Sequence, residues 1–180
     1  MAMKMKINFA LLLDEPTASE CKNLSDEIVK VYNSPVVLGP RSLPHVTILQ
    51  TECEEEELES IWMKSKSVMQ PKYLLNLAGL TLLPSSTGRV WVEIQVLTSE
   101  AILGLQRLLL DLDVFTDRKV FNAVGNKFRP HITLALLEAK PTQGIPLPYS
   151  PLRNSDVVAI PSIGLVGDNY TYIEPIYTLE

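Results

Sequence analysis

The chain has 180 residues, of which 46% are hydrophobic and 21% are charged, and its formal net charge is −5. This length and composition predict one globular domain spanning residues 1–180 and exclude an intrinsically disordered chain. The acidic balance argues against a protein that coats duplex nucleic acid, because such proteins neutralise many phosphates with basic side chains. No apolar run approaches the roughly 18 residues of a membrane span, so no membrane partner is expected.

The chain opens with a predicted strand over residues 6–13. This apolar run is interrupted at Asn8 and ends without the small-residue cleavage site of a signal peptide. Thr17 and Glu20 then match a capping box, which predicts the start of a first helix. The buried stripe of that helix is expected to hold Cys21, Leu24, Ile28 and Val31.

A second strand is predicted over residues 44–50, followed by a second capping box at Thr51 and Glu54. The acidic run 54–57 is better explained as carboxylates that complement a helix dipole than as metal ligands. The helix after this run is expected to continue to Pro71. Its apolar face comprises Leu58, Ile61, Trp62, Ser65 and Met69.

Two strands, over residues 73–80 and 89–96, are predicted on either side of a turn at 84–88. The second strand alternates cleanly and directs Val90, Val92, Ile94 and Val96 to one face, with Arg89, Trp91, Glu93 and Gln95 on the other. A third helix starts from Thr98 or Ser99 and is expected to bury Ile102, Leu105, Leu109 and Leu112. Residues 130–137 then form another strand.

The last third of the chain contains a proline-rich loop at 140–151 and a predicted hairpin of residues 157–166 and 170–179, joined by a turn at 167–169. Pro161 and Pro175 weaken this prediction or place both strands at a sheet edge, because proline cannot donate to the ladder. Tyr170 and Tyr172 lie near the turn. They either pack within the hairpin or stack on a base.

Two of these strands begin with nearly identical pentads, Pro-His-Val-Thr-Ile at 44–48 and Pro-His-Ile-Thr-Leu at 130–134, and these contain both histidines of the chain. On a strand, residues i and i+2 point to the same face, so each His shares a face with the Thr that follows. Core packing gives no reason to confine histidine to two equivalent positions. The pentads therefore predict two halves of one site, built from His45, Thr47, His131 and Thr133.

Cations accompany both pentads. Arg41 and Lys127 each stand four residues before a histidine, and Arg129 precedes the second motif directly. Together with Arg118 and Lys119, they are candidates for a local basic patch that attracts a phosphate. The two cysteines, Cys21 and Cys53, are isolated and lack metal-ligand spacing, so a reducing, cytoplasmic compartment is expected.

The paired His-x-Thr motifs resemble the signature of the 2H phosphoesterase superfamily. The run from Phe128 to Ala135 and the opening from Ile7 to Leu11 are most similar to its bacterial 2′-5′ RNA ligase-like and RNA 2′,3′-cyclic phosphodiesterase branch. The resemblance implies an α+β fold of two pseudo-symmetric lobes, each an antiparallel-rich sheet flanked by helices, around a central cleft. It also implies His131 as the base toward water and His45 as the acid.

The residue types fit this chemistry. Two imidazoles provide an acid and a base near neutral pH, and Thr hydroxyls donate to an anionic phosphate without adding charge. We therefore expect a metal-independent phosphodiesterase, without cofactors, that acts as a monomer on a small nucleotide or an RNA terminus. Arg41, Lys127, Arg129 and Tyr172 are the expected substrate contacts.

Two alternatives remain open at this point. One is a module of the same fold that binds a nucleotide or an RNA end without turnover. The other is a hydrolase with a Ser or Cys nucleophile, although the chain has no nucleophile-elbow motif and the duplicated pentad would then be unexplained.

Overall fold

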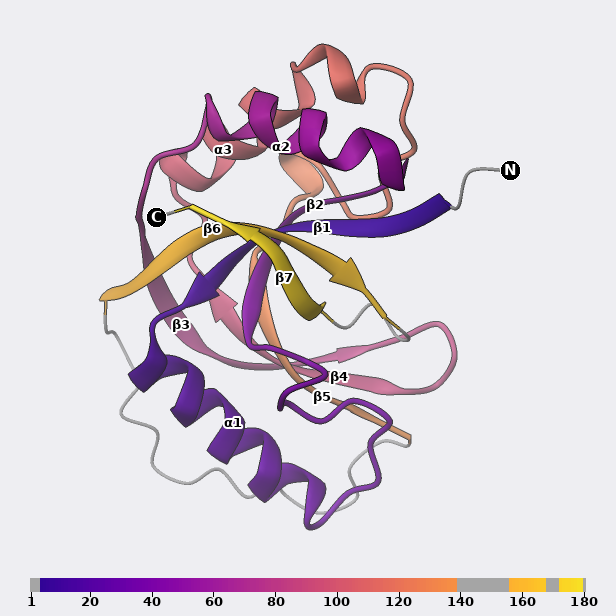
Figure 1. The fold of residues 1–180 in the computed structure, drawn as a ribbon. Helices are drawn as coiled ribbons and strands as arrows, with labels where there is room; N and C mark the ends of the chain where they lie inside the picture. The colour runs from indigo at the N-terminus through magenta and orange to yellow at the C-terminus, as the bar shows by residue number, and fades with distance from the viewer. Residues whose placement is uncertain (1–3, 139–155, 168–171, 180) are drawn as a thin grey trace.

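The computed structural model describes residues 4–138, 156–167 and 172–179 (Figure 1). In these residues a sheet of seven strands has the order β1-β2-β5-β4-β3-β6-β7, and β1 also pairs with β6, which closes a ring of six strands. Every strand pairing is antiparallel. The strands are β1 (Lys4–Leu13), β2 (His45–Glu54), β3 (Tyr73–Pro84), β4 (Val90–Val96), β5 (His131–Leu137), β6 (Asp156–Val166) and β7 (Tyr172–Thr178).

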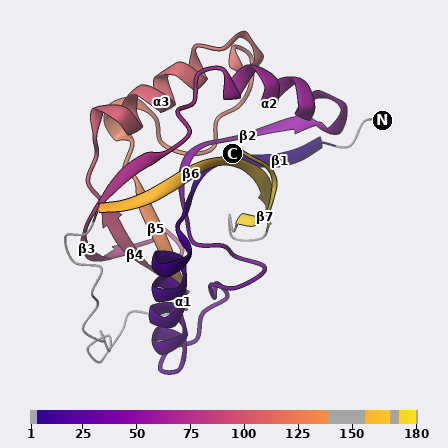
Figure 2. The same ribbon diagram turned by 60° about the vertical axis from the view of Figure 1, so that its left-hand side comes forward.

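The helices divide the molecule into two lobes (Figures 1 and 2). Helix α1 (Glu15–Val29) packs against β5, whereas α3 (Glu100–Leu110) packs against β2 beside α2 (Leu58–Lys66). Each helix covers the motif strand of the other half of the chain. Helix α1 comes from the first half and packs on β5, and α3 comes from the second half and packs on β2. The predicted α+β fold of two lobes is confirmed. Three short 3-10 helices complete the described elements: η1 (Glu55–Glu57), η2 (Asp113–Phe115) and η3 (Gly125–Lys127).

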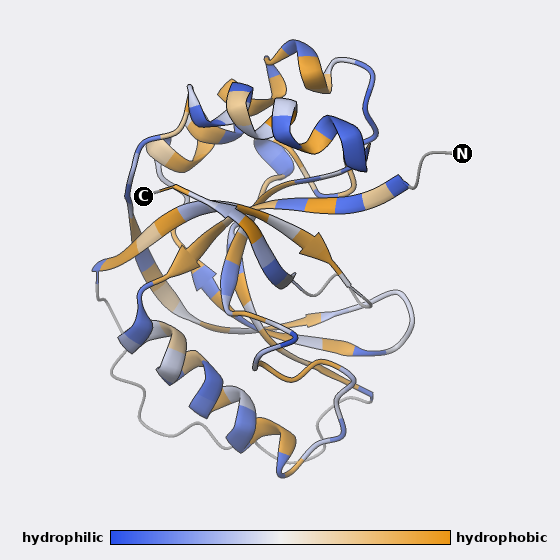
Figure 3. Cartoon of the chain, viewed as in Figure 1, coloured by the Kyte–Doolittle hydropathy of each residue, from blue (hydrophilic) through white to orange (hydrophobic). Residues whose placement is uncertain are grey.

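The hydrophobic core lies between the helices and the sheet. Hydrophobic and hydrophilic residues alternate along the helices, as expected for helices with one face against a sheet (Figure 3). The α2 stripe is confirmed from Leu58 to Ser65, and the α3 stripe at Ile102, Leu105 and Leu109. Both helices end earlier than predicted, so Met69 and Leu112 lie beyond them and are partly buried. In α1, burial extends from Thr17 to Ile28, while Val31 lies beyond the helix and is exposed.

Two of the three predicted helix starts are wrong. Helix α1 begins earlier, with Asp14 as the N-cap, whose carboxylate accepts a hydrogen bond from the Thr17 backbone N–H at 3.1 Å. Strand β2 continues through Thr51 to Glu54, because Thr51 pairs with Ile7 in the sheet. Tertiary pairing therefore overrides the local capping pattern there. The start of α3 is confirmed, since Ser99 accepts from the Ile102 backbone N–H at 3.3 Å.

The predicted pair of C-terminal strands is confirmed, because β6 and β7 pair antiparallel. Of the two, β7 lies at a sheet edge and β6 does not. Strand β6 pairs with β1 along one side, and with β3 and then β7 along the other. Pro161 falls between the segments that pair with β3 and β7, so its missing N–H interrupts neither ladder. Its carbonyl accepts from the Leu179 backbone N–H at 2.9 Å. The predicted loop at 140–151, most of the turn at 167–169, and Tyr170 lie outside the described residues.

Candidate active site

The two motif strands pair antiparallel at the central residues of their pentads, Val46 and Ile132. Both of these side chains are fully buried on the face away from the motif residues. Antiparallel pairing at this point directs His45 toward Thr133 across the strands, and Thr47 toward His131. All four of these side chains line one cavity of about 530 Å³. The pentads thus lie around an approximate two-fold axis that passes between β2 and β5.

The two histidines are anchored in the same way. Nδ1 of His45 lies 2.7 Å from the backbone carbonyl oxygen of Leu43, and Nδ1 of His131 lies 2.8 Å from that of Arg129. Because a carbonyl oxygen only accepts, each Nδ1 carries the hydrogen. This contact fixes the ring orientation and leaves Nε2 of both imidazoles available for proton transfer.

The groups that contact the His45 ring are uncharged. The Tyr172 ring packs against the His45 ring with centroids 5.0 Å apart, and Nε2 of His45 lies 3.2 Å from the amide nitrogen of Asn8. The same Asn8 nitrogen donates to the hydroxyl of Thr47 at 3.0 Å. Burial lowers the pKa of His45 to about 4; the hydrogen bond to Leu43 opposes this shift, and the nearby His131 adds to it.

The surroundings of His131 are charged. The side chain of Glu93 on β4 is only 3% exposed, and its Oε1 lies 3.4 Å from Nε2 of His131. The other carboxylate oxygen of Glu93 lies 2.6 Å from a guanidinium nitrogen of Arg129. One buried carboxylate therefore lies against two basic groups of the second motif.

Both pentads end in a β-bulge, which sets the direction of the motif side chains. The register skips Ile48 where β2 pairs with β1, and it skips Leu134 where β5 pairs with β4. A bulge re-aims the side chains that precede it and leaves backbone groups without ladder partners. Here a buried side chain of the covering helix satisfies each carbonyl: Ser25 of α1 donates to Leu134 at 2.7 Å, and Gln106 of α3 donates to Ile48 at 2.8 Å.

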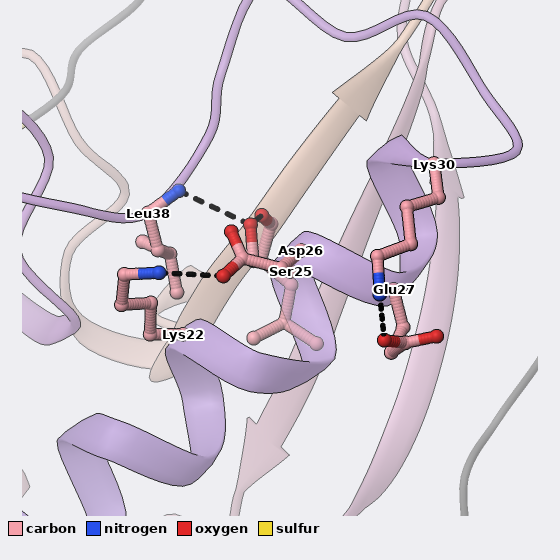
Figure 4. A network of polar contacts seen from close by, with 7 residues as sticks. Lys22, Ser25, Asp26, Glu27, Lys30 and Leu38 are labelled. Atoms are coloured by element: carbon pink, nitrogen blue, oxygen red, sulfur yellow. Dashed lines mark hydrogen bonds and ion pairs between the residues drawn. The ribbon is translucent and has the colours of Figure 1, made fainter.

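Ser25 also orders one wall of the cavity. Its hydroxyl accepts a hydrogen bond from the Leu38 backbone N–H at 3.1 Å (Figure 4). Leu38 and Val36 line the cavity, so α1 supports both the second motif strand and the neighbouring apolar wall. The ion pairs Lys22–Asp26 and Glu27–Lys30 on the outer face of α1 are solvent-exposed and contribute little to stability (Figure 4).

The structure brings some of the expected substrate contacts to the cavity and excludes others. Lys127 and Arg129 line it, whereas Arg41 is exposed outside it. Tyr172 is fully buried, and its hydroxyl lies 2.7 Å from that of Ser162. Its ring therefore packs against His45 but does not line the cavity. Arg118 and Lys119 line a separate hollow, where Arg118 pairs with Glu57 at 2.6 Å.

Sequence reasoning did not identify Asn8 and Glu93 as site residues. Asn8 was visible as the polar interruption of an apolar strand, and Glu93 as a member of the polar face of an alternating strand. Neither of these sequence patterns indicates that the side chain would contact a histidine. Three aromatic residues that the sequence analysis did not assign to the site also line the cavity: Trp91, Phe121 and Phe128.

Among the residues that the structure describes, no group of three or more His, Cys, Asp or Glu side chains is arranged to hold a metal ion. None of the described helices is long and apolar enough to cross a membrane.

Solved structures resemble this chain along nearly its whole length. LigT from E. coli is 17% identical, with 99% of each chain covered and a TM-score of 0.63. TT0787 of Thermus thermophilus is 18% identical over 97% of this chain and 98% of its own, also with a TM-score of 0.63. The MHV ns2 PDE domain is 13% identical over 87% of this chain and 98% of its own, with a TM-score of 0.51. No family model and no curated protein matches the sequence. The chain has the fold of the 2H phosphoesterases.

Proposed function

We propose that this protein is a metal-independent phosphodiesterase that opens 2′,3′-cyclic phosphates or cleaves 2′-5′ linkages at RNA ends or in nucleotides. The observation that carries the proposal is the meeting of both His-x-Thr pairs in one cavity, with each imidazole anchored through Nδ1. Two such imidazoles provide the base and the acid of an in-line displacement. His45, Thr47, His131 and Thr133 are the proposed catalytic residues.

The reaction requires two proton transfers at one phosphorus. One Nε2 takes a proton from water as the water oxygen bonds to phosphorus, and the bond from phosphorus to the leaving ribose oxygen breaks. The other Nε2 gives its proton to that oxygen, so a cyclic phosphate becomes a monoester. The hydroxyls of Thr47 and Thr133 donate to the non-bridging oxygens, where negative charge increases. Ligation would instead use a ribose hydroxyl of a second RNA end in place of water: this hydroxyl loses its proton to one Nε2 as its oxygen bonds to phosphorus, and the cyclic phosphate becomes a phosphodiester.

The cavity walls support a nucleotide as the substrate. Lys127 and Arg129 provide positive charge near the motifs, and the aromatic residues that line the cavity, Trp91, Phe121 and Phe128, are candidates for stacking on a base. LigT has been solved with 3′-AMP, ATP, NADP+ and phosphate. The two cysteines are buried free thiols, which fits our inference of a reducing, cytoplasmic compartment. We also propose that the protein acts as a monomer.

A panel of substrates tests the proposal. The purified protein is incubated with nucleoside 2′,3′-cyclic phosphates, 2′-5′-linked oligonucleotides and ADP-ribose cyclic phosphate, with EDTA present. We expect hydrolysis of at least one of them in EDTA. Loss of all activity in EDTA, restored by a divalent ion, would contradict the metal-independent mechanism. Nucleotide binding without turnover of any substrate would favour the non-catalytic module instead.

A further inference from the structure

A buried amide side chain on β2 lines the cavity beyond the first motif. Gln50 is 7% exposed and shares the cavity with His45 and Thr47. We propose that Gln50 is a specificity-determining residue that reads the edge of an adenine base in the substrate. The inference rests on the proposed function and adds the identity of the base to it.

The β-bulge at Ile48 turns Gln50 toward the cavity. In a regular strand, Leu49 would share a face with His45 and Thr47, because side chains alternate between the two faces. The register of β2 with β1 skips Ile48, so Leu49 is fully buried in the core and Gln50 lines the cavity instead. The bulge therefore extends the polar face of the first motif by one side chain.

The second motif strand has an apolar residue at the corresponding position. Leu136 follows His131 by five residues, as Gln50 follows His45. Its side chain is 3% exposed and does not line the cavity. The two otherwise similar halves of the site therefore differ at this offset, which places base recognition at the end of the first motif strand.

The side-chain amide of Gln50 is available to a ligand. Its backbone N–H donates to Oδ1 of Asn122 at 2.7 Å, and its carbonyl accepts from the Phe121 backbone N–H at 2.9 Å. Within the part of the chain that the structure describes, the side-chain amide has no hydrogen-bond partner. Buried amides are nearly always hydrogen-bonded, because removing them from water without a partner is costly. A ligand in the cavity would provide that partner.

Three other amide side chains beside the first motif already bond to the protein. The Asn8 nitrogen donates to a motif hydroxyl at 3.0 Å. The nitrogens of Gln106 and Asn122 donate to the carbonyl of Ile48 at 2.8 and 3.1 Å. These amides hold the first motif in place, whereas the amide of Gln50 does not.

The distance along β2 suits a nucleoside whose phosphate lies between the two histidines. A strand rises about 3.3 Å per residue, so Gln50 lies roughly 8–10 Å along β2 from Thr47. This leaves room for a ribose between the reacting phosphorus and the amide. A purine extends further from its ribose than a pyrimidine, so a purine reaches Gln50 more readily.

The chemistry of an amide favours adenine over guanine. Its nitrogen donates to N7 of adenine and its oxygen accepts from the N6 amino group, whereas guanine has two acceptors on this edge and is read by cationic side chains. Phe121 and Asn122, which bond to Gln50 and line the cavity, are uncharged. Lys6 and Lys119 lie over the Phe121 ring, 5.2 and 5.1 Å from its centroid, and neither lines the cavity.

Rates on the four common nucleoside 2′,3′-cyclic phosphates test the base preference. We expect the intact protein to have its highest kcat/KM for the adenosine compound. Gln50→Leu should lower that value by roughly 5- to 150-fold, the discrimination of one bidentate contact, and should change the other three much less. Gln70→Leu is the matched control, since Gln70 lies outside the cavity. The absence of an adenosine preference, or an equal preference in Gln50→Leu, would overturn the inference.

A substrate that lacks N7 tests the contact itself. 7-Deazaadenosine 2′,3′-cyclic phosphate has no acceptor for the amide nitrogen, so the parent protein should hydrolyse it more slowly than the adenosine compound. Gln50→Leu should hydrolyse both at similar rates. Gln50→Glu keeps the length of the side chain but loses the donor, and it serves as the second variant if Gln50→Leu does not fold. Equal rates on the two substrates in the parent protein would contradict the proposed contact.

Calorimetric titration with the 3′-monophosphates of adenosine, guanosine and uridine separates this inference from the proposed function. If the adenosine compound binds most tightly and Gln50→Leu removes that preference, but no phosphodiester is hydrolysed, the proposed function fails and base recognition stands. If phosphodiesters are hydrolysed without any base preference, the function stands and the inference fails.

Discussion

The side-chain amide of Gln106 donates a hydrogen bond to the backbone carbonyl of Ile48 at 2.8 Å, and its oxygen accepts from the Gly125 backbone N–H at 3.0 Å. Ile48 is the bulge residue of the first pentad, and Gly125 begins the 3-10 turn that ends at Lys127. One buried side chain of α3 therefore connects the first motif to the segment that carries a cation of the cavity. Ser25 of α1 makes the corresponding contact with the second bulge.

Replacing Gln106 by Leu should lower the free energy of unfolding by about 1–3 kcal/mol, because buried polar groups lose their partner. Equilibrium urea unfolding measures this change. Ser25→Ala is the matched variant at the other bulge, and a similar loss is expected there. Asn122 also donates to the Ile48 carbonyl, at 3.1 Å. If Gln106→Leu is as stable as the parent protein, Asn122 alone satisfies that carbonyl.

Replacing either histidine by Gln should lower kcat by roughly 10²- to 10⁴-fold, the usual contribution of a positioned proton-transfer group. The double variant should lose far less than the product of the two effects, because His45 and His131 act as a unit. Steady-state rates on the substrate identified by the panel give both values. Full activity in His45→Gln would mean that only the second pentad is catalytic.

Replacing Thr47 or Thr133 by Val should lower kcat by roughly 10²- to 10³-fold, because enzymes that lose one hydrogen-bond donor to the charge of the transition state slow down by about this factor. The bell-shaped dependence of the rate on pH should keep both limbs, because neither threonine transfers a proton. The pH–rate profile therefore separates these variants from the histidine variants, each of which should lose one limb. Loss of a limb in Thr133→Val would assign that residue a part in proton transfer.

Neutralising Lys127 or Arg129 should raise KM more than it lowers kcat, and the defect should shrink as salt increases, because the charges attract the phosphate. Arg129→Ala should have the larger effect, since it also removes the partner of Glu93. Arg41→Ala is the control, because Arg41 lies outside the cavity. A KM defect in Arg41→Ala alone would place the phosphate-attracting charge elsewhere.

The stability of the protein should fall as the pH is lowered from 7 to 5. The pKa of His45 is lowered to about 4 in the folded protein, against about 6.5 in the unfolded chain. Between these values the unfolded chain binds more protons, so the free energy of unfolding decreases as pH falls. The contribution of His45 over this range is roughly 2 kcal/mol.

Urea unfolding at several pH values tests this contribution. His45→Gln should lose the part of the pH dependence that His45 causes, whereas a matched surface variant such as Glu100→Gln should retain it. An identical slope of stability against pH in His45→Gln and in the parent protein would contradict the lowered pKa of this ring.

The local sequence was sufficient to identify the motif strands and the buried faces of the helices. The alternation in each pentad places His and Thr together on one face, and the spacing of Ile102, Leu105 and Leu109 marks the buried side of α3. These features depend only on how side-chain direction repeats along a strand or a helix, and a short segment of sequence is enough to show that repeat. The start of α3 at Ser99 is local for the same reason, because the hydrogen bond of its cap spans three residues.

Tertiary structure alone decided which side chains meet the two histidines. Asn8 reaches His45, and Glu93 reaches His131, from strands whose place beside the motifs depends on sheet order. The bulges at Ile48 and Leu134 then decide the direction of each motif, because a shift of one residue turns every preceding side chain to the opposite face. The alternation of residues along a strand does not indicate where such a register shift occurs. The residues proposed for catalysis could therefore be predicted from the two pentads, whereas the different surroundings of the two histidines arise only when distant strands pair.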